Sequence, residues 1–316
     1  MKIGGDVGGT KTLLEARAGA FTLLKQRYQN DEFADFDALL AEFLSTLRQR
    51  HRAPVTATCL AVAGPIAAQA ARLTNRPAWL LEAAGLSARH GLGPTMLVND
   101  FVAAAAGLGG LDAAETRLLQ TGHGDAGGPV LALGPGTGLG VAMVEGEHVV
   151  ASEGGHIGFA PFDAESTALW QLLGAPGRRV TTEQVVSGTG LAACYRLTTA
   201  MSTLPIEPAE VVARATGGEP AATDAVRLFA RCFGAVAGDL ALVFLARGGV
   251  YLAGGITPRL PPELFDAPFL AAFGAKAEHA ALVAGMPVLA VMSEELGLRG
   301  ALHLAMQSGR EEKTHV

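Results

Sequence analysis

The residues with the clearest chemical potential lie at the start of the chain, in Gly5-Asp6-Val7-Gly8-Gly9-Thr10. Strand-like runs flank this stretch, and a Gly-Gly pair between two strands is typical of a tight turn because glycine tolerates positive φ. A turn needs no carboxylate, however, and Asp6 is left unexplained. In a loop that closes on a metal–phosphate, glycine N–H groups approach the phosphate, Thr10 donates a hydroxyl and Asp6 holds magnesium directly or through water.

A second glycine-rich loop follows a strand in the middle of the chain. A predicted strand over 129–133 leads into Gly134-Pro135-Gly136-Thr137-Gly138-Leu139-Gly140, and a return strand covers 141–144. The loop is neither a Walker A motif nor a dinucleotide fingerprint, because no Gly-Lys-Ser/Thr follows and Leu139 stands where the third glycine should fall. Strand, glycine loop with threonine, strand, turn and strand repeat the pattern of residues 2–25. The repeat predicts a duplicated unit with two phosphate loops.

Short polar side chains gather in three other segments. Asn99 and Asp100 follow an apolar strand over 96–98, where ligands of open α/β sheets bind. Glu153 and His156 lie on a glycine-shaped loop, and Glu183 lies in Thr-Thr-Glu. Together these groups suit a polyhydroxylated ligand, since each hydroxyl both donates and accepts. Taken singly, His156 is better explained as an ordinary loop histidine, and Glu183 still more so as part of an ordinary helix start.

A third glycine pair ends a strand near residue 250. The apolar run 250–252 leads into Ala253-Gly254-Gly255. Such a loop can pass closely beneath a nucleoside, but an ordinary strand-to-helix turn has the same sequence. Both interpretations stay open on this segment alone.

Length and composition set further limits. A chain of 316 residues, 49% hydrophobic and 17% charged, predicts a globular protein of two domains. The net charge of −6 leaves no broad basic face for nucleic acid. Among 24 basic residues only five are lysines, so phosphate binding must rely on backbone N–H groups, magnesium or arginine. The lysines are Lys2, Lys11, Lys25, Lys276 and Lys313.

Compartment and membrane topology follow from the cysteines and the apolar runs. Cys59, Cys194 and Cys232 form no CxxC pair, so we expect buried thiols in a reducing cytoplasm rather than disulfides or a zinc site. No signal peptide is recognised at the N-terminus. The longest apolar stretch, 228–245, contains Arg231 and is therefore predicted to be a buried helix and not a membrane span.

Strands and helices alternate along the chain. A short strand is expected over 21–25, and a helix capped by Asp35 over 36–50, where apolar residues recur at helical spacing. A buried strand covers 57–62, and a helix rich in alanine covers 101–108. The order of elements predicts an α/β fold.

These pieces resemble bacterial glucokinase, the ATP-dependent, hexokinase-related member of the sugar kinase, Hsp70 and actin superfamily. They occur in the family's order over essentially the whole chain, and the cysteine-rich zinc motif of the repressor–open-reading-frame–kinase family is absent. The matching segments are 5–10, 73–75 with Trp79, 98–101, 134–140, 153–156, 183–188 and 253–256. The resemblance implies a two-domain actin-like (ribonuclease H-like) ATPase fold with a cleft between domains. The small domain would be 1–108, joined by a C-terminal helix over 297–316, and the large domain 109–296.

The resemblance also implies an activity, the transfer of the γ-phosphate of MgATP to the 6-hydroxyl of D-glucose with Asp100 as general base. The sugar would be held by Asn75, Asn99, Asp100, Glu153, His156 and Glu183. The phosphates would contact Gly5, Val7, Gly8, Gly9, Thr10, Gly136, Thr137 and Gly138, with adenosine beside Gly254 and Gly255 and Mg²⁺ at Asp6. The family further implies a cytoplasmic homodimer without nucleic-acid or membrane partners.

Two alternatives stay open from sequence. One is a kinase of another hexose, such as fructose, mannose or an N-acetylated sugar. The other is a non-catalytic sugar-sensing regulator on the same fold. Against the regulator, no DNA-binding helix pair precedes Met1, and both Asp6 and Asp100 are present.

Overall fold

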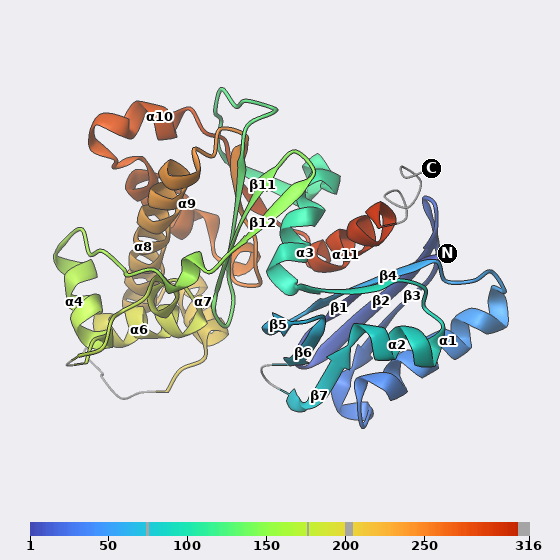
Figure 1. The fold of residues 1–316 in the computed structure, drawn as a ribbon. Helices are drawn as coiled ribbons and strands as arrows, with labels where there is room; N and C mark the ends of the chain where they lie inside the picture. Colours follow the sequence, from blue (N-terminus) through green and yellow to red (C-terminus); the bar gives the residue numbers. More distant parts are fainter. Residues whose placement is uncertain (74–75, 176, 200–204, 309–316) are drawn as a thin grey trace. The chain divides into compact units, whose positions relative to one another are not determined.

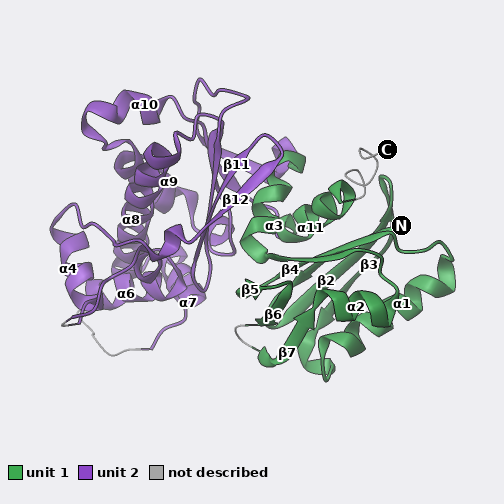
Figure 2. Cartoon of the chain, viewed as in Figure 1, with its two compact units in different colours: residues 1–111, 295–316 green, residues 112–294 purple. Residues whose placement is uncertain are grey.

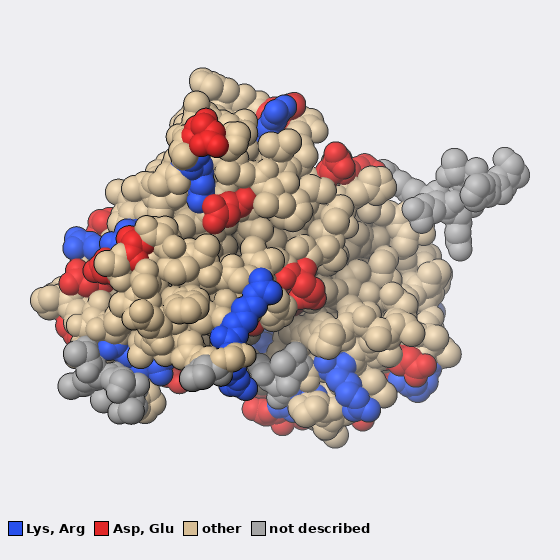
Figure 3. Space-filling model, turned by 60° about the vertical axis from the view of Figure 1, so that its left-hand side comes forward, with Lys and Arg blue, Asp and Glu red and all other residues tan. Residues whose placement is uncertain are grey.

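The computed structural model describes residues 1–73, 76–175, 177–199 and 205–308. The chain divides into two compact units, one formed by 1–111 with 295–316 and the other by 112–294 (Figure 2). None of the helices in the described residues has the length and apolar character needed to cross a membrane. On the face drawn in Figure 3, basic and acidic side chains are interspersed among uncharged ones.

Unit 1 is built on a five-stranded sheet that confirms the predicted opening hairpin. Three antiparallel strands come first in the sequence, and two further strands run parallel to β1. From edge to edge the sheet contains β3 (Phe21–Gln29), β2 (Lys11–Ala18), β1 (Lys2–Val7), β4 (Ala57–Val62) and β8 (Thr95–Asn99). Strand β3 extends beyond the predicted 21–25, because its pairing with β2 continues to Lys11 opposite Gln29.

Helices cover both faces of this sheet (Figure 1). On one face α1 (Phe36–Arg50) begins where Asp35 accepts a hydrogen bond from the Ala38 N–H at 2.8 Å, as predicted, and buries its apolar side in the core. On the other face α3 (Asp100–Gly107) and α11 (Leu296–Gln307) pack against β4 and β1 through small residues. The remaining elements are α2 (Ala83–His90) and a small sheet of β5 (Ile66–Ala67), β6 (Ala70–Leu73) and β7 (Arg76–Glu82).

Unit 2 repeats the strand plan of unit 1. After β9, which forms an antiparallel edge strand, come three antiparallel strands and then two strands that run parallel to β10. From edge to edge the sheet contains β12 (His148–Ser152), β11 (Leu139–Glu145), β10 (Val130–Pro135), β13 (Gly249–Leu252), β14 (Val288–Val291) and β9 (Thr116–Gln120). The order β12-β11-β10-β13-β14 matches β3-β2-β1-β4-β8, so the predicted duplication is confirmed.

The core of unit 2 surrounds α8 (Pro220–Phe244), which confirms the buried helix predicted over 228–245. Phe233 of α8 packs edge-on against Phe269 of α9 (Pro262–Gly274), with ring centroids 5.3 Å apart. Arg231 lies near the middle of α8, is partly exposed and pairs with Asp163 at 3.1 Å. The other helices are α4 (Ala164–Leu173), α5 (Thr182–Val185), α6 (Gly188–Thr198), α7 (Pro208–Thr216) and α10 (Ala280–Ala284).

All three cysteines are buried and unpaired, as predicted. Burial raises the pKa of the Cys59 and Cys232 thiols to about 12 and that of Cys194 well above its ordinary value. Thiols in such surroundings stay protonated and act as small apolar side chains.

Candidate functional site

The first glycine loop, Gly8–Thr10, turns its carbonyl groups toward the protein. Gly8 O accepts from Asn30 Nδ2 at 2.8 Å, Thr10 O from the Asn30 N–H at 2.9 Å, and Gly9 O from Arg76 Nε at 3.4 Å. Within the described chain the N–H groups of Gly9 and Thr10 have no protein acceptor. Backbone N–H groups that converge without a partner form an anion-binding concavity. The loop is therefore prepared for phosphate oxygens.

Asn30 is a supporting residue that the sequence did not reveal. It is fully buried in the short helix η1 (Asn30–Glu32) after β3, and its side chain joins Gly8 O to the Thr12 hydroxyl at 2.8 Å each. A buried polar side chain with all these partners fixes the loop's conformation. Nothing in the sequence around Asn30 distinguishes it from an ordinary turn residue.

Asp6 lies at the end of β1, on the sheet face covered by α11. The first turn of α11 approaches so closely that a Cβ at Gly297 would lie 2.9 Å from Asp6 Oδ2, so only glycine fits without displacement. Burial and the negative charge of Asp100 raise the pKa of Asp6 to about 6, while Arg27 opposes them. Gly297 and Arg27 are further contributors that the sequence did not reveal.

Asn99 and Asp100 lie where β8 becomes α3. Asn99 Oδ1 caps the helix by accepting from the N–H groups of Phe101 at 2.9 Å and Val102 at 3.4 Å. Only the Asn99 Nδ2 group thus stays available as a donor. The Asp100 residue is exposed, but neighbouring protein atoms partly desolvate its carboxyl and raise its pKa, against the opposing hydrogen bond from the Phe101 N–H at 2.8 Å. Since β1 and β8 both run parallel to β4, Asp6 and Asp100 lie at the same end of the sheet, where the carboxyl ends of these strands meet.

The second glycine loop, in unit 2, is held from outside by two helices. Gly136 O accepts from the Gly188 N–H of α6 at 2.8 Å, and the Leu139 N–H donates to Glu183 Oε2 of α5 at 3.0 Å. A side chain at Gly138 would collide with the Glu183 carboxylate, so glycine is required for this approach. Thr137 at the tip is exposed. Glu183, predicted as a sugar ligand, thus supports the second glycine loop.

Glu153, His156 and Glu183 are brought together in unit 2. The Thr182 hydroxyl, which the sequence did not single out, donates to Gly155 O at 2.6 Å and ties α5 to the turn η4 (Gly154–His156). His156 Nε2 lies 3.6 Å from Glu153 Oε2, and His156 Nδ1 lies 4.0 Å from Glu183 Oε1. The Glu153 side chain is 91% exposed and available for a ligand.

The remaining predicted residues differ in their surroundings. Gly254 and Gly255 follow β13, beside the second glycine loop, since the Ile256 N–H donates to Pro135 O at 3.3 Å. Gly5 and Val7 lie inside β1, buried and paired on both sides, so they offer a nucleotide no side chain. Asn75 lies outside the described residues.

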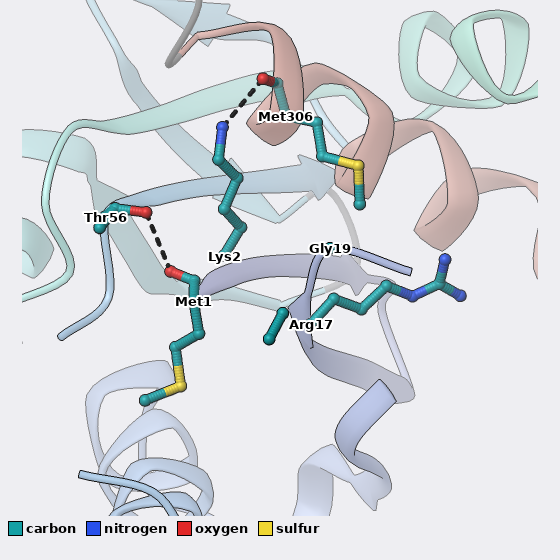
Figure 4. Close-up of a pocket in the computed structure, with 7 residues that line it drawn as sticks. Met1, Lys2, Arg17, Gly19, Thr56 and Met306 are labelled. Atoms are coloured by element: carbon teal, nitrogen blue, oxygen red, sulfur yellow. Dashed lines mark hydrogen bonds between the residues drawn. The ribbon is translucent and has the colours of Figure 1, made fainter. Parts of the chain in front are cut away.

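A hollow of about 430 Å³ lies at the other end of β1, by Lys2 rather than Asp6 (Figure 4). The Lys2 ammonium donates to the carbonyl oxygens of Ala305 at 2.8 Å and Met306 at 2.9 Å, at the C-terminal end of α11. The Thr56 hydroxyl donates to Met1 O at 3.2 Å. These polar groups are engaged in structural hydrogen bonds, and none of the predicted site residues lines this hollow.

Asp6 is suited to magnesium as one carboxylate among other ligands. Within the described residues no cluster of three His, Cys, Asp or Glu side chains could enclose a metal ion. Mg²⁺ is commonly held by one or two carboxylates together with waters and substrate phosphates. A partly buried carboxylate beside the first glycine loop, which is predicted to bind phosphate, fits that coordination.

The raised pKa of Asp6 predicts that Asp6→Asn stabilises the nucleotide-free protein at neutral pH. The native state binds the Asp6 proton up to about pH 6, so stability falls as pH rises from 3.8 to 6. At about 1.36 kcal/mol for each pKa unit, the asparagine variant should gain roughly 2–3 kcal/mol at pH 8 and nothing below pH 4. Urea unfolding followed through Trp79, buried in unit 1, measures the difference. The exposed Asp224→Asn serves as control, and an equal gain at both pH values would contradict the prediction.

Comparison with known proteins supports one family. A family model described as Glucokinase matches residues 3–308. Glucokinase from Sinorhizobium fredii (strain NBRC 101917 / NGR234) is 38% identical over 315 residues, covering 94% of this chain and 89% of that protein. The solved glucokinase from an Antarctic psychrotroph is 28% identical, with a TM-score of 0.85 over 97% of this chain and 98% of that chain.

A more distant solved structure shares the fold. The ROK family glucokinase from Streptomyces griseus, in complex with glucose and AMPPNP, is 23% identical, with a TM-score of 0.66 over 97% of this chain and 99% of that chain. These likenesses confirm the predicted two-domain actin-like ATPase fold. Because the family model matches nearly the whole chain and a relative is 38% identical, the chain belongs to the glucokinase family.

Proposed function

We propose that the chain transfers the γ-phosphate of MgATP to the 6-hydroxyl of D-glucose, with Asp100 as the general base. Family membership makes the chain an ATP-dependent hexose kinase. The roles of single residues in this proposal are supported by their geometry and chemistry within each unit.

The observation that supports the proposal most strongly is the position of Asp6 and Asp100. Both lie at the carboxyl end of the sheet, beside a loop with available N–H groups. Phosphoryl transfer needs positioning and charge neutralisation more than covalent chemistry. The arrangement offers a carboxylate for the metal, a carboxylate for the proton and N–H donors for the phosphate. A sugar-sensing regulator would need neither carboxylate.

Asp100 is suited to accept the proton of the 6-hydroxyl. Its raised pKa makes it a better proton acceptor than an ordinary aspartate, and its exposed position allows a substrate to approach. The Phe101 N–H holds one carboxylate oxygen at 2.8 Å, which leaves the other to face the sugar. Asn99 Nδ2 would donate to a neighbouring hydroxyl.

The nucleotide would use both glycine loops. The N–H groups of Gly9 and Thr10 would bind phosphate from unit 1, and Gly136–Gly138 would bind it from unit 2, with adenosine beside Gly254 and Gly255. Asp6 would hold Mg²⁺, which neutralises the phosphate charge that develops during transfer.

Glucose would be bound by groups from both units. Glu153, His156 and Glu183 would accept and donate hydrogen bonds in unit 2, whereas Asn99 and Asp100 belong to unit 1. Asn75 stays a candidate on resemblance alone. In this proposal unit 1 corresponds to the small domain and unit 2 to the large domain of a sugar kinase, and a cytoplasmic homodimer is expected from the family.

Two assays test the substrate and the assembly. Glucose-dependent release of ADP in the presence of Mg²⁺, with fructose, mannose and N-acetylglucosamine at equal concentration, distinguishes glucose from the other hexoses. Light scattering during size-exclusion chromatography measures the oligomeric state.

Asp100→Asn should abolish most of the activity. Asparagine keeps the shape and hydrogen-bonding reach of aspartate but cannot take the proton, and loss of a general base costs on the order of 10² to 10⁴ in rate. We expect kcat to fall by that factor while ATP affinity is nearly unchanged. Steady-state assays with Asp224→Asn as a matched carboxylate control measure the effect. More than a tenth of wild-type kcat in Asp100→Asn would exclude Asp100 as the base.

Glu183 should give different results for two substitutions, because one oxygen supports the glycine loop. Glu183→Gln keeps an acceptor for the Leu139 N–H, so ATP affinity should hold while glucose binds about tenfold or more weakly. Glu183→Ala leaves that N–H without its acceptor, so affinity for both ligands should fall. Calorimetric titration with each ligand separates the cases. A Glu183→Gln protein that loses ATP and glucose affinity equally would show that Glu183 is no sugar ligand.

A further inference from the structure

Arg27 lies in one row with Asp6 across the hairpin of unit 1. Asp6 of β1 is opposite Leu13 of β2, and Leu13 is opposite Arg27 of β3. Residues directly opposite in antiparallel strands point to the same face. Two strand spacings separate the Cα atoms of Asp6 and Arg27 by about 10 Å, and an extended arginine side chain covers most of that distance. The guanidinium can therefore reach over Leu13 toward the carboxylate.

The charge of Arg27 already acts on this region. Its guanidinium lowers the pKa of Asp6, in opposition to burial and to Asp100, which places the positive charge near the carboxylate. The residue is exposed, and in the described part of the chain its side chain has no hydrogen bond or ion pair. Its full set of N–H donors is thus available to a ligand.

Three neighbouring cations are engaged elsewhere, whereas Lys11, the exposed first residue of β2, has no ion pair in the described residues. Lys25, two residues earlier on the same strand face, pairs with Glu295. Arg17 pairs with the buried Glu15 at 2.5 Å. Arg76 bonds Gly9 O and pairs with Asp31. Compared with these three side chains, Arg27 lies near Asp6 and its side chain has no hydrogen bond or ion pair in the described residues.

The surroundings of Asp6 need a positive charge when a nucleotide binds. A triphosphate would enter next to two carboxylates, and the loop offers it only neutral N–H groups. Arginine binds phosphate through two parallel N–H···O bonds that lysine cannot reproduce. We propose that Arg27 binds the β- or γ-phosphate of the nucleotide, and that it supplies from β3 the charge that the first glycine loop lacks. This inference rests on the proposed function, because it takes the nucleotide to bind beside Asp6.

Calorimetric titration of the intact protein with AMPPNP in the presence of Mg²⁺, and separately with AMP, tests the inference. Arg27→Gln should weaken AMPPNP binding by about ten- to a hundredfold and leave AMP within about twofold, since AMP lacks the outer phosphates. Arg27→Lys should recover only part of the affinity. The glucose affinity of each variant should equal that of the wild type.

Lys25→Gln is the matched control, because it removes one positive charge from the same strand face, in the neighbouring row opposite Glu15. Its AMPPNP affinity should stay within about threefold of the wild type, as expected for a partly exposed ion pair. Unchanged melting temperatures without nucleotide show that the variants fold.

Equal AMPPNP affinity in wild type and Arg27→Gln would overturn the inference but would not contradict the proposed function. A loss confined to Lys11→Gln would also overturn it and assign the charge to Lys11. If the wild type fails to phosphorylate glucose but binds AMPPNP in an Arg27-dependent way, the proposed function fails and the inference stands.

Discussion

The constraint on which unit 1 depends is the repulsion between two carboxylates at the carboxyl end of its sheet. Asp6 lies near the carboxyl end of β1 and Asp100 follows β8, and burial together with the negative charge of Asp100 raises the pKa of Asp6 to about 6. Such a pair destabilises the nucleotide-free fold at neutral pH. In the proposed function, Mg²⁺ bound between the carboxylates and the phosphates would offset this repulsion, so the pair that weakens the empty protein would favour the loaded one.

The duplicated sheets support their glycine loops in different ways. In unit 1 the loop is fixed from its own hairpin, by Asn30 at the end of β3. In unit 2 the loop is fixed by helices that follow the strands, through Glu183 and the Gly188 N–H. Loop conformation in unit 2 is therefore linked to a residue proposed to contact the sugar, whereas in unit 1 it is independent of Asn99 and Asp100.

Local patterns made much of the fold predictable from sequence, and long-range contacts explain what stayed hidden. Closely spaced glycines beside a carboxylate or threonine identified both loops, helical spacing predicted 36–50, and the repeated strand–loop–strand order predicted the duplicated sheets. The resemblance to a family supplied further site candidates, Asn75 among them. Gly297, by contrast, approaches Asp6 from the other end of the chain, and no local pattern marks it. Asn30 is one of three asparagines in the chain, and no local pattern distinguishes it until the loop folds onto it.

Water is the hazard that this chemistry has to exclude, because MgATP beside a competent base could transfer phosphate to it. Water would be excluded by geometry if the proposed sugar ligands, which belong to different units, took up their binding positions only when glucose binds. Small-angle scattering with and without saturating glucose, before any nucleotide is added, measures this most directly. A glucose-bound protein with a smaller radius of gyration is the expected result. An unchanged radius at saturating glucose would contradict a site that the sugar closes.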